Sequence, residues 1–216
     1  LPKVKLEIAV PDDIAEAVQW RRYLHAHPEL SLHERATSDF IAGKLAEWGL
    51  NVRRGLGKTG VVATVSKGSS GRSIAIRADI DALPIVEATG VAHQSRMPGR
   101  MHACGHDGHM AMLLAAARRA RDLNFDGTVH FIFQPAEESE GGARLMIEDG
   151  LFEACPCDQV FALHNWPGLP VGQCVARDGA MMAAFAVFEI VLTGRGAHAA
   201  MPHEGIDPVP AAAALT

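Results

Sequence analysis

The sequence predicts an α/β fold in which a mainly parallel sheet is connected by crossover helices. Between residues 73 and 167 the order of predicted elements is strand, helix, strand, helix, strand, which is typical of such a sheet. Several of the strand-like runs lead into acidic residues or histidine. A chain of 216 residues with a hydrophobic fraction of 48% has room for one substantial domain, or for one domain and part of a second.

The individual helices and strands follow from local patterns. Residues 11–28 begin with Pro-Asp-Asp and carry apolar residues at near-helical spacing, which predicts a capped amphipathic helix that ends at Pro28. A second helix is predicted over residues 33–50, closed by Gly49. The other elements of this part are predicted strands over 60–68, 73–84, 127–138 and 158–167, and predicted helices over 108–124 and 141–152.

The pattern changes near Gly179. Residues 183–196, AAFAVFEIVLTGRG, predict a strand of a new kind, and residues 197–216 predict a loop that leads into the first turns of a helix. We therefore expect residues 1–179 to form most of a first domain. Residues 180–216 would be the start of a second, smaller domain that is cut short.

Composition excludes several classes of protein. A net charge of -5 and a pI near 6.1 give no basic surface for nucleic acid, and no apolar run reaches the ~18 residues that a membrane span needs. The N-terminus has neither a secretory h-region nor an initiator Met, so the chain is expected to be trimmed or incomplete. The cysteines are not spaced as a disulfide framework, which favours a reducing cytoplasm. They are Cys104, Cys155, Cys157 and Cys174.

Potential metal ligands follow the predicted strands. In open α/β sheets, ligands bind outside the carboxyl ends of the strands. The segment MHACGHDGHM, residues 101–110, lies between the strand over 73–84 and the helix that follows it. Four separated segments therefore bring acids, a thiol and imidazoles to one edge of the sheet. These groups are Asp79, Asp81, Cys104, His106, Glu137, Glu138 and His164.

The chemistry of this set fits a metal centre. Cys104 and His106 are two residues apart, so on extended backbone their side chains point the same way; we expect both to bind from a loop, before a helix that begins at about Gly108. A thiolate, imidazoles and carboxylates together suit zinc, manganese, cobalt or nickel better than calcium or magnesium. Of the pair Glu137–Glu138, one carboxylate can hold metal while its neighbour acts as general base.

Each of these residues also has an ordinary interpretation when it is taken alone. Two glutamates before a helix complement its dipole, a histidine at a strand end is commonly hydrogen-bonded, and a single cysteine is a small buried apolar residue. All of these would have to hold at once for the site to be absent. A structural zinc site fits less well, because it would have four closed Cys or His ligands and no spare carboxylate. His102 and His109 are expected to support the ligands.

The chain resembles the M20 metallopeptidase family, in particular its aminoacylase-like branch of hippurate hydrolases and N-acyl-amino-acid amidohydrolases. The similarity extends over almost the whole chain in family order. It rests on the segments RRYLHAHPELSLHE, RADIDALPI, MHACGHDGHMAMLLAAA, FIFQPAEESEGGARLMIEDGLF, ALHNWPGLPVG and GRGAHAAMPHEGIDPV. The resemblance implies a zinc-peptidase-like catalytic domain, here residues 1–179, beside a smaller α/β lid domain that dimerises, here begun by residues 180–216.

The resemblance also implies roles for individual residues. The implied metal ligands are Cys104, His106, Glu138 and His164. Glu137 would be the general base, and Asp81 would orient a ligand. His198 would reach a neighbouring active site across a dimer and stabilise the oxyanion.

The implied activity is hydrolysis of the amide bond of N-acyl amino acids, with hydroxide held by two divalent metal ions as the nucleophile. The metals would be zinc or manganese, with cobalt or nickel as alternatives. The implied assembly is a homodimer or homotetramer formed through the lid domain. Family members are much longer and take a last histidine ligand from a C-terminal segment, so we expect this chain to be a fragment. A related peptidase, a carbamoyl-type amidohydrolase and a non-catalytic binding module that keeps the fold remain as alternatives.

Overall fold

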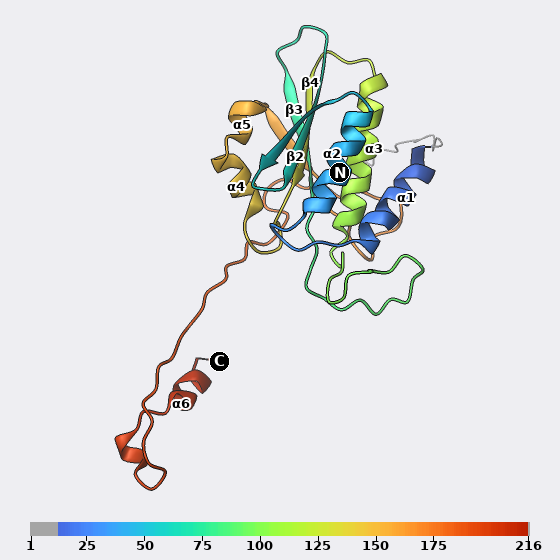
Figure 1. Ribbon diagram of the computed structural model, residues 1–216. Helices are drawn as coiled ribbons and strands as arrows, with labels where there is room; N and C mark the ends of the chain where they lie inside the picture. The colour runs from blue at the N-terminus through green and yellow to red at the C-terminus, as the bar shows by residue number, and fades with distance from the viewer. Residues whose placement is uncertain (1–12, 216) are drawn as a thin grey trace. The chain divides into compact units, whose positions relative to one another are not determined.

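The computed structural model describes residues 13–215 (Figure 1). The chain forms two compact units, the first of which ends at Pro167 while the second begins at Gly168. Each unit is described by itself. The domain boundary expected after Gly179 stays a prediction.

The first unit contains most of the regular structure. Its helices are α1 (Asp13–Ala26), α2 (Arg35–Glu47), α3 (His106–Asp122), α4 (Gly142–Glu148) and α5 (Leu151–Ala154). Its strands are β1 (Asn51–Leu56), β2 (Gly60–Lys67), β3 (Ser73–Asp79), β4 (Gly127–Gln134) and β5 (Gln159–Ala162). The second unit contains a short 3-10 helix, η1 (Pro202–Glu204), and α6 (Pro208–Ala213). No helix within residues 13–215 is both long and apolar enough to cross a membrane.

The five strands form one sheet in the order β1-β2-β4-β3-β5. β3 pairs in parallel with both β4 and β5, whereas β2 runs antiparallel to its neighbours β1 and β4. Four strands therefore point the same way, and the predicted α/β fold with a mainly parallel sheet is confirmed. β1 was not predicted. Most of its side chains are exposed, so it lacks the buried apolar alternation that marks a strand in the sequence.

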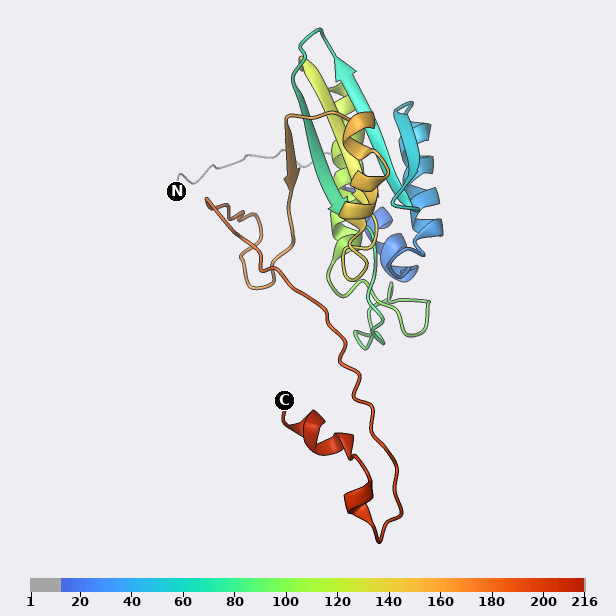
Figure 2. The same ribbon diagram turned by 90° about the vertical axis from the view of Figure 1, so that its left-hand side faces the viewer.

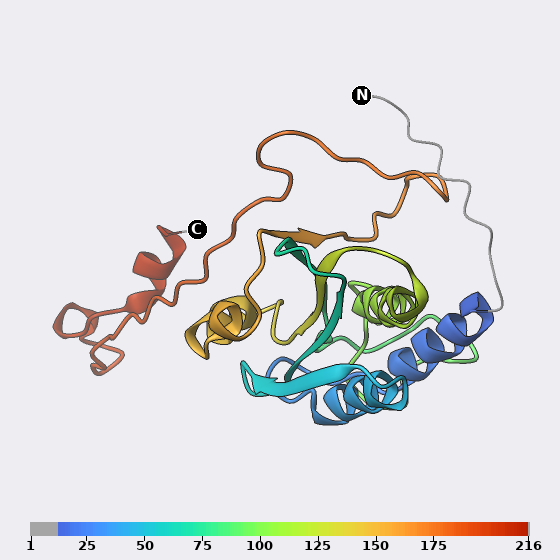
Figure 3. The same cartoon turned by 90° about the horizontal axis from the view of Figure 1, so that it is seen from above.

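Two apolar cores cover the two faces of the sheet. Successive side chains of a strand point to opposite faces, and the side chains of β4 are accordingly shared between the two cores. Phe131 and Phe133 join the larger core with α1, α2 and α3, whereas Ile132 joins the smaller core with α4 and α5. Figure 2 shows α4 and α5 in front of the sheet with α3 behind it, and Figure 3 shows the same separation from above. The central strand β4 is therefore covered on both of its faces, as is usual in a parallel sheet.

The register brings the functional segments to one edge. Asp79, the last residue of β3, pairs with Gln134, the last residue of β4, and Ala162 at the end of β5 pairs with Arg77. The segments that follow these three strands therefore begin at the same edge of the sheet. The first turn of α3 reaches this edge as well, because His106 Nδ1 lies 2.9 Å from the Asp81 carbonyl oxygen.

Two local predictions were wrong. α3 begins at His106 rather than at about Gly108, because Gly105 adopts a left-handed conformation with φ 87° that turns the chain directly into the helix. Residues 183–194 form no strand. A strand needs a neighbour for its backbone hydrogen bonds, and among the described residues this segment has none; a single bridge joins Arg195 to Ile206.

We expect Phe131→Ala to destabilise the first unit strongly. Phe131 is 1% exposed in the larger core, and removal of a buried phenylalanine ring costs about 3–5 kcal/mol. Urea unfolding would measure the loss. Phe152→Ala is the matched control, because Phe152 is 39% exposed, and it should change the free energy of unfolding far less. Equal losses for the two variants would contradict the assigned core.

Candidate metal centre

Cys104, His106 and Glu138 converge at the carboxyl edge of the sheet. One ligand atom from each lies within 4.8 Å of the others. His106 Nε2 is 3.6 Å from Glu138 Oε1, and both atoms are buried without a hydrogen-bond partner among residues 13–215. Buried polar atoms are nearly always paired, so these two atoms mark a place that fits a cation.

Hydrogen bonds decide which nitrogen of His106 is free. Its Nδ1 lies 2.9 Å from the Asp81 carbonyl oxygen, which can only accept, so Nδ1 carries the hydrogen. The lone pair is then on Nε2, the atom that faces Glu138. The Asp81 carboxylate is itself held by two donors, the Ser31 hydroxyl at 2.7 Å and the Glu138 amide at 3.0 Å. Asp81 thus contacts both His106 and Glu138, and its role in orienting a ligand stays a prediction.

His164 lies beside Cys104. Its Nε2 is 3.4 Å from Cys104 Sγ, and its Nδ1 donates to the Asn165 carbonyl oxygen at 2.7 Å. Nε2 is therefore the nitrogen that is free to bind. The Cys104 sulfur therefore lies close to free ligand atoms of His106, Glu138 and His164, with which it could help to hold metal.

His109 belongs to the site but has no free nitrogen. A second group of potential ligands within 4.8 Å comprises Asp79, His106, His109 and His164. His109 Nδ1 lies 2.6 Å from Asp79 Oδ1, and its Nε2 accepts from the Asn165 amide at 3.0 Å. It therefore supports the ligands, linking the end of β3 to the segment that carries His164. His109 is three residues from His106, so both lie on one helix face. This spacing is the feature of the sequence that indicates a supporting role for His109.

Negative charge dominates the electrostatics. Burial raises the pKa of the Cys104 thiol to about 12, together with the nearby charges of Glu138, Asp79 and Glu137, so the thiolate needs a cation beside it. Burial would raise the pKa of Asp79 too, but the hydrogen bond from His109 and the charges of His106 and Arg77 outweigh it and lower that pKa to about 2.

Glu137 differs from its neighbour. Its side chain is 38% exposed, and its Oε2 is 4.0 Å from His106 Nε2. Burial and the charge of Glu138 raise its pKa above the usual value. Glu137 thus presents a carboxylate of increased basicity beside the free ligand atoms.

The sequence missed a buried network behind the site. His25 lies in the last turn of α1, yet it is only 4% exposed. Its Nδ1 is 2.9 Å from Asp107 Oδ2, and Arg21 Nε is 2.7 Å from the same oxygen. Asp107 follows His106 directly, so this network fixes the start of α3. His102 is buried as well, which lowers its pKa to about 4, and neither of its nitrogens has a partner among the described residues.

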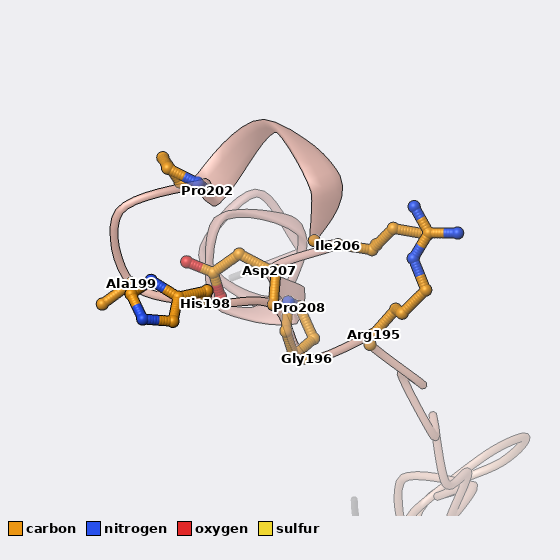
Figure 4. Close-up of a pocket in the computed structure, with 11 residues that line it drawn as sticks. Arg195, Gly196, His198, Ala199, Pro202, Ile206, Asp207 and Pro208 are labelled. Atoms are coloured by element: carbon orange, nitrogen blue, oxygen red, sulfur yellow. The ribbon is translucent and has the colours of Figure 1, made fainter.

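His198 lies in the second unit, where residues of the segment 194–208 line a pocket of about 380 Å³ (Figure 4). His198 Nδ1 accepts a hydrogen bond from the Ala200 amide at 3.1 Å, so the hydrogen is on Nε2. Arg195 Nε and Nη2 donate to the Glu204 carbonyl oxygen at 3.1 and 2.7 Å and close the loop. His198 belongs to the second unit, whereas Cys104, His106, Glu138 and His164 belong to the first.

We expect Cys104→Ala to lower the metal content of the complete natural polypeptide, because the Cys104 sulfur lies with ligand atoms of His106 and Glu138 and is 3.4 Å from His164 Nε2. Elemental analysis after dialysis would measure the metal. Cys174→Ala is the matched control, since Cys174 is a free and exposed cysteine. Unchanged metal content in Cys104→Ala would remove Cys104 from the ligand set.

Comparison with known proteins places these residues in a family. Residues 75–215 match Peptidase family M20/M25/M40. Hippurate hydrolase of Campylobacter jejuni is 45% identical over 195 residues, which cover 90% of this chain and 51% of that protein. N-acetyl-L-cysteine deacetylase of Bacillus subtilis is 46% identical over 197 residues, which cover 90% of this chain and 47% of that protein.

A solved structure agrees with both the fold and the proposed centre. The YXEP protein of Bacillus subtilis, described as a dinuclear metal binding peptidase from the M20 family, matches with a TM-score of 0.70 and 43% identity, over 74% of this chain and 45% of that chain. The chain spans about half the length of the curated relatives it matches. The family match covers well over half of this chain, and it confirms the resemblance predicted from the sequence. The chain belongs to the M20/M25/M40 peptidase family.

Proposed function

We propose that the protein hydrolyses the amide bond of N-acyl amino acids. The observation that carries the proposal is the Glu137 carboxylate, which lies 4.0 Å from the unpaired Nε2 of His106. A base beside a set of free ligand atoms suits hydrolysis and has no purpose in a structural metal site. The similarity to a hippurate hydrolase and an N-acetyl-L-cysteine deacetylase supports this substrate class.

Two divalent metal ions fit the ligand atoms that the structure leaves free. Cys104, His106, Glu138 and His164 would hold them, and this mixture of thiolate, imidazole and carboxylate suits zinc or manganese, with cobalt or nickel as alternatives. When bound, the metals would polarise the amide carbonyl and lower the pKa of water. A reducing compartment such as the cytoplasm would keep the thiol ligand available.

Glu137 would move the proton. It takes a proton from the attacking water and delivers it to the nitrogen of the leaving amino acid, so the amine departs in neutral form. The raised pKa of Glu137 favours this double role, because a base works best when its pKa lies nearer the working pH. Asp81 would keep His106 and the backbone of Glu138 in place during the reaction.

His198 would stabilise the oxyanion of the tetrahedral intermediate. Its Nε2 carries the hydrogen, because Nδ1 already accepts from the Ala200 amide, and a preorganised donor of this kind lowers the barrier. We propose that it acts on the site of a partner subunit in a homodimer or homotetramer, as the family resemblance implies. Residues 180–216 would then be the start of the lid domain.

A related peptidase activity is the second candidate, because the YXEP protein is described as a peptidase. The two activities share the metal centre and the base, so they differ only in the group attached to the amino acid nitrogen. A panel that contains hippurate, N-acetylcysteine, other N-acyl amino acids and free dipeptides separates them. Turnover of dipeptides alone would replace the proposed substrate class.

We expect Glu137→Gln to retain its metals and to lose about 10²–10⁴-fold in kcat, the usual contribution of a general base. Kinetics with the best N-acyl amino acid of the panel and elemental analysis would be measured together on the complete natural polypeptide. Glu138→Gln is the comparison variant, and it should lose metal as well as activity. An unchanged kcat in Glu137→Gln would exclude it as the base.

Mixing two inactive variants tests His198 across subunits. His198→Ala should keep its metals but lose activity, whereas Cys104→Ala should lose metal. Mixed dimers would contain one intact site, so an equal mixture after subunit exchange should regain roughly a quarter of the wild-type activity for a twofold-symmetric dimer. No recovery, despite mixed dimers detected by mass spectrometry, would contradict the action of His198 on a partner.

A further inference from the structure

The Glu34 carboxylate is fully buried, and the proposed reaction does not use it. Its side chain lies just before α2, with no measurable exposure. Glu34 Oε1 accepts from the Ala136 amide at 2.9 Å, and Oε2 accepts from the Thr59 hydroxyl at 2.7 Å. A buried carboxylate is costly unless its oxygens are paired. The bond from Ala136 ties the start of α2 to the segment that follows β4, and the bond from Thr59 ties it to the turn between β1 and β2.

Ala136 has an unusual backbone conformation. Its φ is 51°, in the left-handed region that residues with a Cβ rarely adopt. The residue is completely buried, its amide donates to Glu34, and its carbonyl oxygen accepts from the Gly142 amide at 2.9 Å. Strained conformations of this kind persist only where the surrounding contacts enforce them.

The two residues after Ala136 are Glu137 and Glu138. The left-handed turn at Ala136 therefore sets the direction in which the base and the ligand leave β4. At the far end of this short turn, the Glu138 amide donates to Asp81 Oδ2 at 3.0 Å. The turn is thus held by two carboxylates from different segments, Glu34 at its start and Asp81 at its end.

We propose that Glu34 is a positioning residue for the metal centre. By holding the Ala136 amide, it keeps the turn in the conformation that directs Glu138 toward His106 and Glu137 toward the bound substrate. This inference rests on the proposed function for the role of Glu137. The part that concerns Glu138 and the metal does not depend on the substrate.

Thr59 provides a control for a merely structural role. Thr59→Val removes the hydroxyl that donates to Glu34 Oε2, and leaves the bond between Glu34 and Ala136. Glu34→Ala removes both bonds. Glu34→Gln keeps an oxygen for the Ala136 amide, and its NH₂ group can donate to the Thr59 hydroxyl oxygen. Glu34→Asp keeps the charge but shortens the side chain, and replaces Glu34→Ala in the comparison if that variant does not fold.

The experiment measures zinc affinity by competition with a chelator, together with kcat, KM and urea unfolding, on the complete natural polypeptide. We expect Glu34→Ala to weaken zinc binding and to lower kcat by about 10–100-fold each, the usual effect of removing a group that orients a metal ligand. KM should change much less, because no substrate contact is removed. Glu34→Gln and Thr59→Val should stay close to wild type in zinc affinity and kcat.

Two results would overturn the proposal. One is a folded Glu34→Ala variant with wild-type zinc affinity and kcat. The other is that Thr59→Val and Glu34→Ala lose zinc affinity and kcat equally, and in proportion to the stability that each loses in urea unfolding. That result would make Glu34 a structural residue only. If the wild-type protein hydrolyses no compound of the panel, the proposed function fails, while the zinc affinities still decide whether Glu34 positions Glu138.

Discussion

Acidic groups crowd around His106, and their mutual repulsion constrains the rest of the site. The carboxylates of Asp79, Glu137 and Glu138 each have an oxygen 3.6–4.0 Å from His106 Nε2. Like charges this close disfavour ionisation unless cations or hydrogen bonds compensate. Arg77 and His109 compensate the charge of Asp79, whereas Glu138 Oε1 has no hydrogen-bond partner in the part of the chain that the structure describes. Divalent cations would supply the missing positive charge.

Backbone groups select the atoms that remain available. Nδ1 of His106 donates to the Asp81 carbonyl oxygen, and Nδ1 of His164 donates to the Asn165 carbonyl oxygen. Both Nε2 atoms are then left with lone pairs beside Cys104 and Glu138. His109 differs because both of its nitrogens are used. Three histidines close together therefore divide into two potential ligands and one support, and the hydrogen bonds of each ring make the difference.

Local patterns in the sequence were sufficient for most of the fold. The apolar run of β4 and the small and apolar residues of α3 predicted these two elements, and the acids after β3 and β4 predicted the functional edge. β1 was missed because its side chains are mostly exposed. The start of α3 was placed too late, because it depends on the left-handed Gly105 and on a contact between His106 and Asp81. Neither is visible in hydrophobic periodicity.

The sequence by itself determined the types of ligand and their places at the ends of strands, because strand order and strand ends follow from short-range patterning. Only the tertiary structure decided which atoms are free and which residues hold them. Glu34 and Ala136 are 102 residues apart in the chain, and His25 is 82 residues from Asp107. A glutamate before a helix or a histidine at its end looks like an ordinary surface residue in the sequence. Its burial and pairing depend on segments that meet only when the sheet and its covering helices have packed.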